Sequence, residues 1–329
     1  MKLCVTGGAG YVGSVVAARL AGEGHEVTVL DNLSTGHRAA VPGGCRFVEG
    51  DVRDDAALAR ALDPATDAVL HFAASSVVAE SMQRPLEYFD NNAGGTLRLL
   101  RAMETRAIRR LVFSSTAAVY GTPSVLPIGE DAPCRPENPY GWSKLMVEWM
   151  LETSRAAWGL RYVALRYFNA GGAAGAHGED HRPESHLIPI VLDAALGTRD
   201  RVTVFGDDYP TRDGTCVRDY IHVSDLAQAH VLALGAMERG TSGAVNLGSE
   251  SGFTVMEVIR ATERITGRPV PVTIGPRRAG DPPALVASSR HAQAVLGWSR
   301  RESSLDEIIA SACAWRRANP GGYGAGPAA

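Results

Sequence analysis

Short apolar runs alternate with longer amphipathic segments along the first half of the chain. The apolar runs predict six strands, at residues 3–5, 26–30, 46–51, 68–73, 111–115 and 161–168. The amphipathic segments predict helices after residue 13 and at about 54–62, 86–103 and 140–155. Because short connections join strands to helices, the pattern predicts an α/β fold with a doubly wound parallel sheet.

The alternation becomes looser after residue 169. Helices are predicted at about 187–196 and 224–237, and from a cap at Thr254 to Gly267, with strands at 202–205 and 244–248. We therefore expect a first domain at 1–169, with part of 217–248 packed back onto it, and a smaller α/β domain at 170–320. Residues 321–329, rich in Gly, Pro and Ala, are expected to form a flexible tail.

A glycine-rich turn follows the first predicted strand. Its spacing, G-x-x-G-x-x-G over residues 7–13, is a variant of the dinucleotide fingerprint G-x-G-x-x-G. We expect Gly7 to form the tight turn, Gly10 to admit a phosphate close to the backbone, and Gly13 to let the helix pack on the strand. The helix N-terminus then faces a pyrophosphate. Many strand-to-helix corners need glycine, so the turn alone is weak evidence.

Asp31 strengthens this interpretation. It ends the second predicted strand, 18 residues after Gly13, where a carboxylate can accept hydrogen bonds from the two ribose hydroxyls. A simple turn cap is the alternative. No arginine follows Asp31 directly, and its charge would repel a 2′-phosphate, so the sequence favours NAD over NADP.

Candidate ligand-binding residues follow most strands of the predicted sheet. They lie at 7–13, Asp31, Asp51, 72–76 and 114–116. Parallel sheets of this type bind ligands at the carboxyl ends of their strands. The sequence therefore predicts one binding edge built from five separate segments.

Tyr140 and Lys144 open a predicted helix and lie one turn apart, so their side chains face the same way. A phenol has an ordinary pKa of about 10, which is too high for a base near neutral pH. A nearby ammonium and an oxidised nicotinamide favour the phenolate. An exposed helix face is the alternative, but the position after a dinucleotide-binding half favours catalysis.

Composition narrows the possible partners and location. The net charge of −3 provides no basic surface for nucleic acid, so local arginines must hold any anion. The five scattered cysteines include no C-x-x-C pair, which indicates a reducing, cytoplasmic setting. We expect no signal peptide, because the first residues already form a core strand. We also expect no membrane span, because no apolar run approaches about 20 residues.

The segment 170–185 and the residue after it include His177, His181 and His186 together with Glu179 and Asp180. A metal site is one interpretation. Gly178 and Pro183 break the segment, and no helical H-x-x-x-H or H-E-x-x-H pattern is present. We therefore expect no metal and a loop that reaches toward substrate.

Ten motifs extend through nearly the whole chain: TGGAGYVGS, LDNLSTG, FVEGDVRD, RPLEYFDNN, FSSTAAVYG, PYGWSKLMVE, LRYFNAGGA, FGDDYPTRDGTCVRDYIHV, NLGS and PRRAGDPPALVASS. On these motifs the chain resembles the UDP-glucose 4-epimerases, an extended branch of the short-chain dehydrogenase/reductase family. The resemblance implies a Rossmann-type NAD-binding domain, a UDP-sugar-binding domain, a tightly bound NAD and a homodimer. It also implies inversion at C4 of UDP-glucose and UDP-galactose through a transient 4-keto sugar.

The resemblance also assigns roles to individual residues. It implies that Tyr140 is the base on the sugar 4-hydroxyl, that Lys144 binds the nicotinamide ribose, and that Thr116 orients the 4-oxygen. The implied NAD contacts are Gly7, Gly10, Tyr11, Val12, Gly13, Asp31, Asn32, Leu33, Ser34, Thr35, Gly36, Asp51, Val52, Phe72, Ala73, Ala74, Ser76, Asn91, Ser114, Tyr140, Lys144 and Phe168. The implied UDP-sugar contacts are Ser76, Thr116, Tyr140, Asn169, His186, Leu187, Thr203, Val204, Phe205, Arg218, Tyr220, Arg278, Asp281 and Leu285.

Departures from the family pattern leave alternatives open. Ser76 replaces a lysine of some relatives, His186 replaces an asparagine, and Leu285 lies where a tyrosine excludes 2-acetamido sugars. UDP-xylose/UDP-arabinose and UDP-GlcNAc/UDP-GalNAc therefore remain alternative substrate pairs. A dehydratase is disfavoured, because Ala117 and Ala118 occupy the places of its Asp-Glu pair. A non-catalytic NAD-binding module is disfavoured by the intact Thr116, Tyr140 and Lys144.

Overall fold

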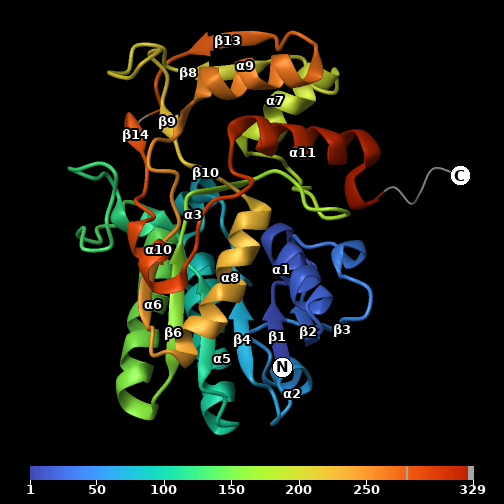
Figure 1. Cartoon of the computed structure of the whole chain (residues 1–329), viewed down its shortest axis with the longest axis vertical. Helices are drawn as coiled ribbons and strands as arrows, with labels where there is room; N and C mark the ends of the chain where they lie inside the picture. Colours follow the sequence, from blue (N-terminus) through green and yellow to red (C-terminus); the bar gives the residue numbers. More distant parts are fainter. Residues whose placement is uncertain (279–280, 325–329) are drawn as a thin grey trace, which may run out of the picture.

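The computed structural model describes residues 1–278 and 281–324. Its centre is a seven-stranded parallel sheet in the order β11-β6-β5-β4-β1-β2-β3, with helices on both faces (Figure 1). The strands are β1 (Lys2–Thr6), β2 (Glu26–Asp31), β3 (Arg46–Glu49), β4 (Ala68–His71), β5 (Arg110–Ser114), β6 (Arg161–Arg166) and β11 (Gly243–Asn246). The predicted doubly wound sheet is confirmed, and β11 extends it from a distant part of the chain.

Alternating side chains of the strands form two separate hydrophobic cores. Leu3 and Val5 pack on one face with α1 (Tyr11–Gly22), α8 (Val223–Glu238) and α10 (Arg290–Leu296). Cys4 points to the other face, into a core shared with α2 (Asp55–Ala61), α5 (Gly95–Thr105) and α6 (Pro139–Trp158). Both faces of the sheet are covered, as is usual for parallel sheets.

The long helix predicted at 86–103 is divided into three parts. It begins as α4 (Pro85–Tyr88), continues as a π-helical segment (Phe89–Gly94) and ends as α5. Asn91 and Asn92 lie in the π-helical segment, a form that often occurs at functional sites. The short helix α3 (Val78–Gln83) just before it has no counterpart in the sequence-based prediction.

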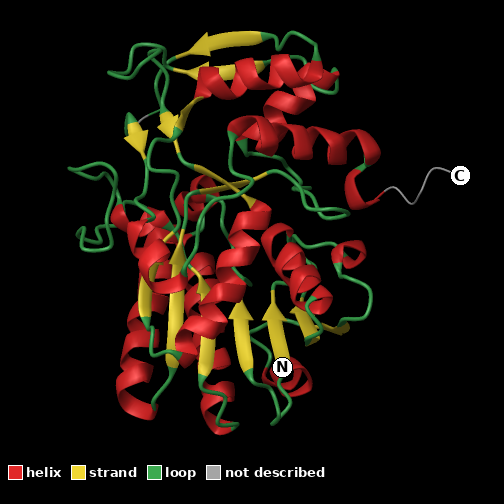
Figure 2. Ribbon diagram, viewed as in Figure 1, coloured by secondary structure: helices red, strands yellow, loops and turns green. Residues whose placement is uncertain are grey.

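A smaller part of the molecule lies beyond the carboxyl ends of the sheet strands (Figure 2). Its helices are α7 (Leu187–Leu196), α9 (Val255–Thr266) and α11 (Leu305–Ala318). Its short strands are β8 (Val202–Phe205) paired with β13 (Val272–Gly275), and β9 (Val217–Arg218) between β12 (Phe253–Thr254) and β14 (Ala284–Leu285). The predicted Thr254 cap is confirmed, since its hydroxyl accepts from Glu257 N in a capping box.

Two details correct the sequence-based prediction. The sixth strand, predicted at 161–168, ends at Arg166, and Asn169 begins β7 (Asn169–Gly171), which pairs with β10 (Tyr220–His222) in a separate sheet. The expected flexible tail does not begin at residue 321, because Tyr323 N donates to Asp180 Oδ2 at 2.9 Å and its ring stacks on His37. The rest of that prediction, 325–329, lies outside the described residues. Among the described residues, none of the helices has the length and apolarity needed to cross a membrane.

Gly248, just after β11, gives a stability prediction. A Cβ at this position would lie 1.9 Å from the backbone oxygen of Ala287. Gly248→Ala should therefore lower the free energy of unfolding by about 1–3 kcal/mol, which is the usual cost of overpacking. Urea unfolding followed by circular dichroism measures this. The matched control is Gly22→Ala, where a Cβ meets nothing within 4 Å, and a change beyond about 0.5 kcal/mol there would contradict the steric argument.

Candidate active site

The glycine turn between β1 and α1 is held by close backbone packing. Gly7 has a φ of 72°, and a Cβ on it would lie 2.5 Å from Ala73 N. A Cβ on Gly13 would lie 2.2 Å from Gly7 O. The N-cap of α1 is Gly10, and neither a side-chain cap nor an acidic residue occupies its first turn. The first N–H groups of α1 are thus available to an anion such as a pyrophosphate.

Asp31 connects this turn to the next loop. Its Oδ2 accepts from Ala9 N at 2.9 Å and its Oδ1 from Leu33 N at 2.8 Å. Burial raises the pKa of Asp31, and these two backbone hydrogen bonds oppose the rise. The carboxylate is therefore fixed at the tip of β2, with lone pairs left on both oxygens.

The loop after β2 continues this binding edge. It contains Leu33, Ser34, Thr35 and Gly36, and Ser34 N donates to Asn32 Oδ1 at 3.0 Å. A Cβ on Gly36 would lie 2.9 Å from the carbonyl carbon of Ala9, so this loop also lies directly against the glycine turn.

A second acidic group follows β3. Asp51 accepts from Asn32 Nδ2 at 2.9 Å and pairs with Arg53, whose Nη1 is 2.8 Å from Asp90 Oδ2. Hydrogen bonds from Arg53 hold the pKa of Asp51 well below its usual range. Val52 instead points into the core of α2, α5 and α6, so this residue offers only its backbone to a ligand.

The loop after β4 lies close to the π-helical segment. Ser75 N donates to Asn92 Oδ1 at 2.8 Å, and Asn91 Nδ2 donates to Ser75 Oγ at 3.1 Å. Phe72, Ala73 and Ala74 are half-buried, whereas Ser76 is exposed. Asn92 also donates to Ser143 Oγ at 2.9 Å, which connects this loop to α6.

The predicted catalytic residues come together where β5 ends and α6 begins. Thr116 is the N-cap of the 3-10 helix Ala117–Tyr120; its hydroxyl accepts from Ala118 N at 3.1 Å and lies near enough to the Tyr140 phenol to lower its pKa. Lys144 is 3% exposed, and its Nζ donates to Ser114 O at 3.0 Å. The same Nζ lies 5.9 Å from the Tyr140 ring centroid. An ammonium, a phenol and a hydroxyl thus share one small region.

A buried polar network that no sequence motif predicted lies next to these residues. Glu148, one turn after Lys144 on α6, pairs with Arg166 of β6, and both side chains are 7% exposed. Glu148 Oε1 also accepts from Ser115 Oγ at 2.5 Å. Arg166 Nη1 donates to Tyr120 OH at 2.7 Å. The i,i+4 spacing of Lys144 and Glu148 was the available signal.

Two predicted substrate residues form an ion pair near the short β9 sheet. Arg218 Nη2 lies 3.1 Å from Asp281 Oδ1. Leu285 of β14 is in register with Arg218. Arg278 lies over the Phe205 ring, 3.9 Å from its centroid. The structure therefore gathers these five residues around the two small sheets.

Other predicted substrate residues point elsewhere. Val204 and Tyr220 have side chains buried in separate hydrophobic cores, so their predicted role in substrate binding would have to use their backbones. A strand alternates its faces, and Val204 lies on the inner face of β8 whereas Thr203 is exposed. Asn169 Nδ2 donates to the backbone oxygen of Asp219 at 2.8 Å, which joins β7 to the β10 segment.

Two hydrogen bonds join the predicted NAD-contact residues or their neighbours to the segment after β7. Tyr11 OH donates to Gly172 O at 2.6 Å. His37 Nε2 lies 2.9 Å from Asp180 O. Val12 packs against the core of α1 and α8, and Phe168 against the core around Tyr120.

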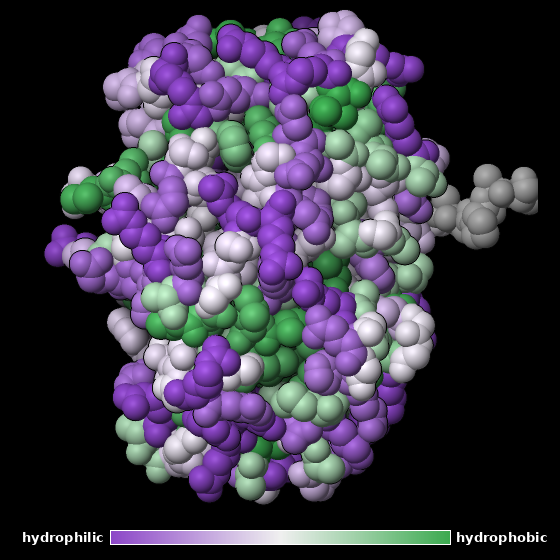
Figure 3. Space-filling view, in the orientation of Figure 1, coloured by the Kyte–Doolittle hydropathy of each residue, from purple (hydrophilic) through white to green (hydrophobic). Residues whose placement is uncertain are grey.

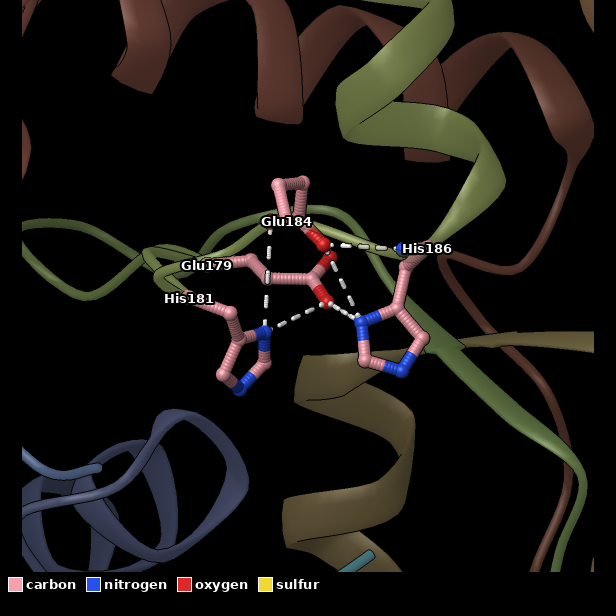
Figure 4. A group of neighbouring side chains, drawn as sticks. All are labelled: Glu179, His181, Glu184 and His186. Atoms are coloured by element: carbon pink, nitrogen blue, oxygen red, sulfur yellow. Dashed lines mark hydrogen bonds and ion pairs between the residues drawn. The ribbon is translucent and has the colours of Figure 1, made fainter. Parts of the chain in front are cut away.

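The segment before α7 gathers four side chains (Figure 4). Glu179 Oε1 lies 2.8 Å from His186 Nδ1 and 3.2 Å from His181 Nδ1, and Glu184 Oε1 lies 3.3 Å from His186 Nδ1. Leu187, the next residue, begins α7 and packs against two cores of the smaller part.

The family-level comparison agrees with this arrangement. The model of the NAD dependent epimerase/dehydratase family matches residues 3–248. The UDP-glucose 4-epimerase of Streptomyces lividans is 52% identical over 324 residues, which cover 98% of each chain.

Solved structures are similar over the whole fold. The UDP-glucose 4-epimerase of Brucella ovis in complex with NAD gives a TM-score of 0.92 at 50% identity, covering 95% of this chain and 97% of that one. The Bifidobacterium longum enzyme in complex with NAD+ and UDP gives 0.91 at 39% identity, covering 98% and 100%. The match extends from β1 to β11, and the chain therefore belongs to the NAD dependent epimerase/dehydratase family.

Proposed function

We propose that this protein interconverts UDP-glucose and UDP-galactose by inversion at C4 through a transient 4-keto sugar. The observation that carries the proposal is the convergence of Thr116, Tyr140 and Lys144 at the carboxyl end of β5. The similarity to UDP-glucose 4-epimerases over almost the whole chain supports the same substrate pair.

NAD is the cofactor of the family, and the residues present fit it. The first turn of α1 lacks a side-chain cap, which suits the pyrophosphate, and Asp31 suits the adenosine ribose. Asn32, Asp51, Phe72, Asn91 and the loop 33–36 complete the proposed set. When bound, the nicotinamide supplies a hydride acceptor that later returns the hydride.

Tyr140 is the proposed base that takes the proton from the sugar 4-hydroxyl and later returns it. Burial raises the pKa of its phenol, and the Thr116 hydroxyl opposes the rise. A phenolate therefore needs positive charge nearby, which the Lys144 ammonium provides. Thr116 orients the 4-oxygen toward the phenol.

Inversion requires that the UDP part stays fixed while the keto sugar presents its other face. Arg218, Asp281, Phe205 and Arg278 are the proposed UDP contacts, and Asn169, His186 and Leu187 extend them toward the sugar. The ion pair and the stacked guanidinium give these groups defined positions. Leu285 has no polar group with which to hold a hexose, so the sugar is left free to turn.

We also propose a homodimer in the cytoplasm. Trp142, Met146 and Trp149 lie at i, i+4 and i+7 on α6 and are 41%, 38% and 56% exposed. Leu97 on the neighbouring α5 is 41% exposed. Such an apolar stripe marks an interaction surface, and a second copy of this helix pair fits it. All five cysteines are unpaired, as expected in a reducing compartment.

Replacement of Tyr140 tests the mechanism. Purified protein should convert UDP-galactose to UDP-glucose without added NAD, and Tyr140→Phe should lower kcat by about 100-fold to 10,000-fold, because proton transfer contributes this much. Product is measured by chromatography, with UDP-GalNAc and UDP-arabinose tested in parallel. Bound NAD released by denaturation is the control for intact folding. Unchanged turnover in the variant would exclude Tyr140 as the base.

Lys144 gives a pH prediction. Burial lowers the pKa of Lys144 to about 7, against the opposing effect of Glu148, whereas an unfolded lysine has a pKa of about 10.4. Burial of the ammonium therefore lowers the stability of the folded state. This cost is full below pH 7 and falls progressively as the pH rises to 10.4. We compare the free energy of unfolding of Lys144→Met with that of wild type at each pH. This difference should favour the variant more at pH 6 than at pH 9, by on the order of 2 kcal/mol.

Urea unfolding at the two pH values measures this difference. Lys2→Met is the control, because its side chain is 46% exposed. An equal effect of Lys144→Met at both pH values would mean that the buried ammonium does not titrate in this range.

The proposed dimer is tested with Trp149→Arg. A charged side chain in the apolar stripe should give a monomer in analytical ultracentrifugation, because a buried unpaired charge is costly. The control is Val125→Arg, in the loop between Thr116 and α6, where Val125 is 73% exposed. This loop projects at the left edge of the molecule in Figure 1, and Figure 3 shows hydrophobic residues at that edge. A Trp149→Arg protein with unchanged mass would place the interface elsewhere.

A further inference from the structure

Four potential metal ligands gather within eight residues of the chain, just before α7. Glu179, His181, Glu184 and His186 each contribute one oxygen or nitrogen, and these atoms all lie within 4.8 Å of one another (Figure 4). The segment is E-x-H-x-x-E-x-H, a pattern that a helix would not bring to one point. An irregular loop with Pro183 in it folds them together.

The surrounding structure fixes this loop. Glu184 Oε1 accepts from the backbone N–H groups of Ser185 and His186, and His186 is the N-cap of α7. Arg316 of α11 donates to Glu179 O at 3.3 Å. The four side chains therefore converge from a backbone held by two helices.

The ligand atoms are close to one another but poorly paired. Both carboxylate side chains are only 9% exposed. Nδ1 of His181, Nδ1 of His186 and Oε2 of Glu184 are all buried without a hydrogen-bond partner among the described residues. Distances of 2.8–3.9 Å between the nitrogens and oxygens are ion-pair distances, yet the ring nitrogens do not point along hydrogen bonds to the oxygens. Buried polar atoms in this state call for an explanation.

A metal ion between the side chains would explain both the close approach of the ligand atoms and their lack of hydrogen-bond partners. Zinc binds imidazole nitrogen and carboxylate oxygen at about 2.0–2.2 Å, so tetrahedral ligands lie roughly 3.3 Å apart. Four of the nitrogen–oxygen separations, 2.8, 3.2, 3.3 and 3.9 Å, lie around that value, and all four ligand atoms lie within 4.8 Å of one another. Two carboxylates also offset the charge of a divalent cation, which removes the cost of burying them together.

We propose that Glu179, His181, Glu184 and His186 bind one divalent transition-metal ion of the zinc class. This proposal replaces the expectation of no metal in the segment, which rested on the absence of a helical ligand spacing. The ion would hold His186 through Nδ1 and leave Nε2 free to face a ligand. It would also fix a segment that contacts the other half of the molecule through Asp180 and His37. Its effect on UDP-sugar binding rests on the proposed function, but the presence of metal does not.

The test is metal binding by the purified, NAD-containing protein. The protein is dialysed against a chelator, mixed with a slight excess of zinc and passed through a desalting column. Mass spectrometry should then find one zinc per chain. Cobalt(II) should give the visible absorption of a tetrahedral site, and zinc should remove it. Less than about 0.1 metal per chain, or a cobalt spectrum of octahedral type, would overturn the proposal.

Variants assign the ligands. His181→Ala and, separately, Glu184→Gln should weaken zinc binding at least about 100-fold, since even loss of an outer-shell partner costs about 10–100-fold. His291→Ala, which removes an exposed histidine of α10, should bind like wild type. Bound NAD shows that each variant is folded. Zinc should raise the Tm of wild type and not of His181→Ala. Equal zinc binding by wild type and His181→Ala would overturn the assignment of the ligands. Loss of epimerase activity alone would concern only the proposed function.

Discussion

The active-site geometry depends on the buried pair of Glu148 and Arg166. The pair joins α6 to β6, and through Ser115 and Tyr120 it reaches the end of β5 and the 3-10 helix after it. A buried ion pair adds little net stability, but removal of one partner leaves an unpaired charge that costs several kcal/mol. The pair therefore acts mainly to fix how α6 lies against the sheet.

That fixed relation matters because the proposed chemistry uses groups from two elements. Thr116 comes from the end of β5, whereas Tyr140 and Lys144 come from the first turns of α6. Lys144 spans the gap by donating to Ser114 O, and its burial disfavours its own charge. An ammonium that is costly to bury is stabilised by a neighbouring phenolate, so each group favours the charged form of the other.

The fold and half of the site could be predicted because their signals are local. The glycine turn, Asp31 and the Tyr140–Lys144 spacing each follow from one strand end or one helical turn. The π-helical form at Asn91 and Asn92 could not be predicted, since periodicity does not distinguish it from an α-helix. The inward direction of Val204 and Tyr220 depends on which face of a short strand is covered. The packing of Tyr323 depends on an aromatic partner, His37, that is distant in sequence.

The two halves of the molecule meet mainly through the segment between β7 and α7. Gly172 accepts from Tyr11 beside the glycine turn, and Asp180 contacts His37 just after the loop 33–36. The same segment ends at His186, which begins the substrate half. The residues that would retain the dinucleotide and those that would hold UDP are thus parts of one connected backbone. A rigid anchor inside this segment would stabilise both binding regions at once, while the hexose end of a bound substrate would keep the freedom that inversion requires.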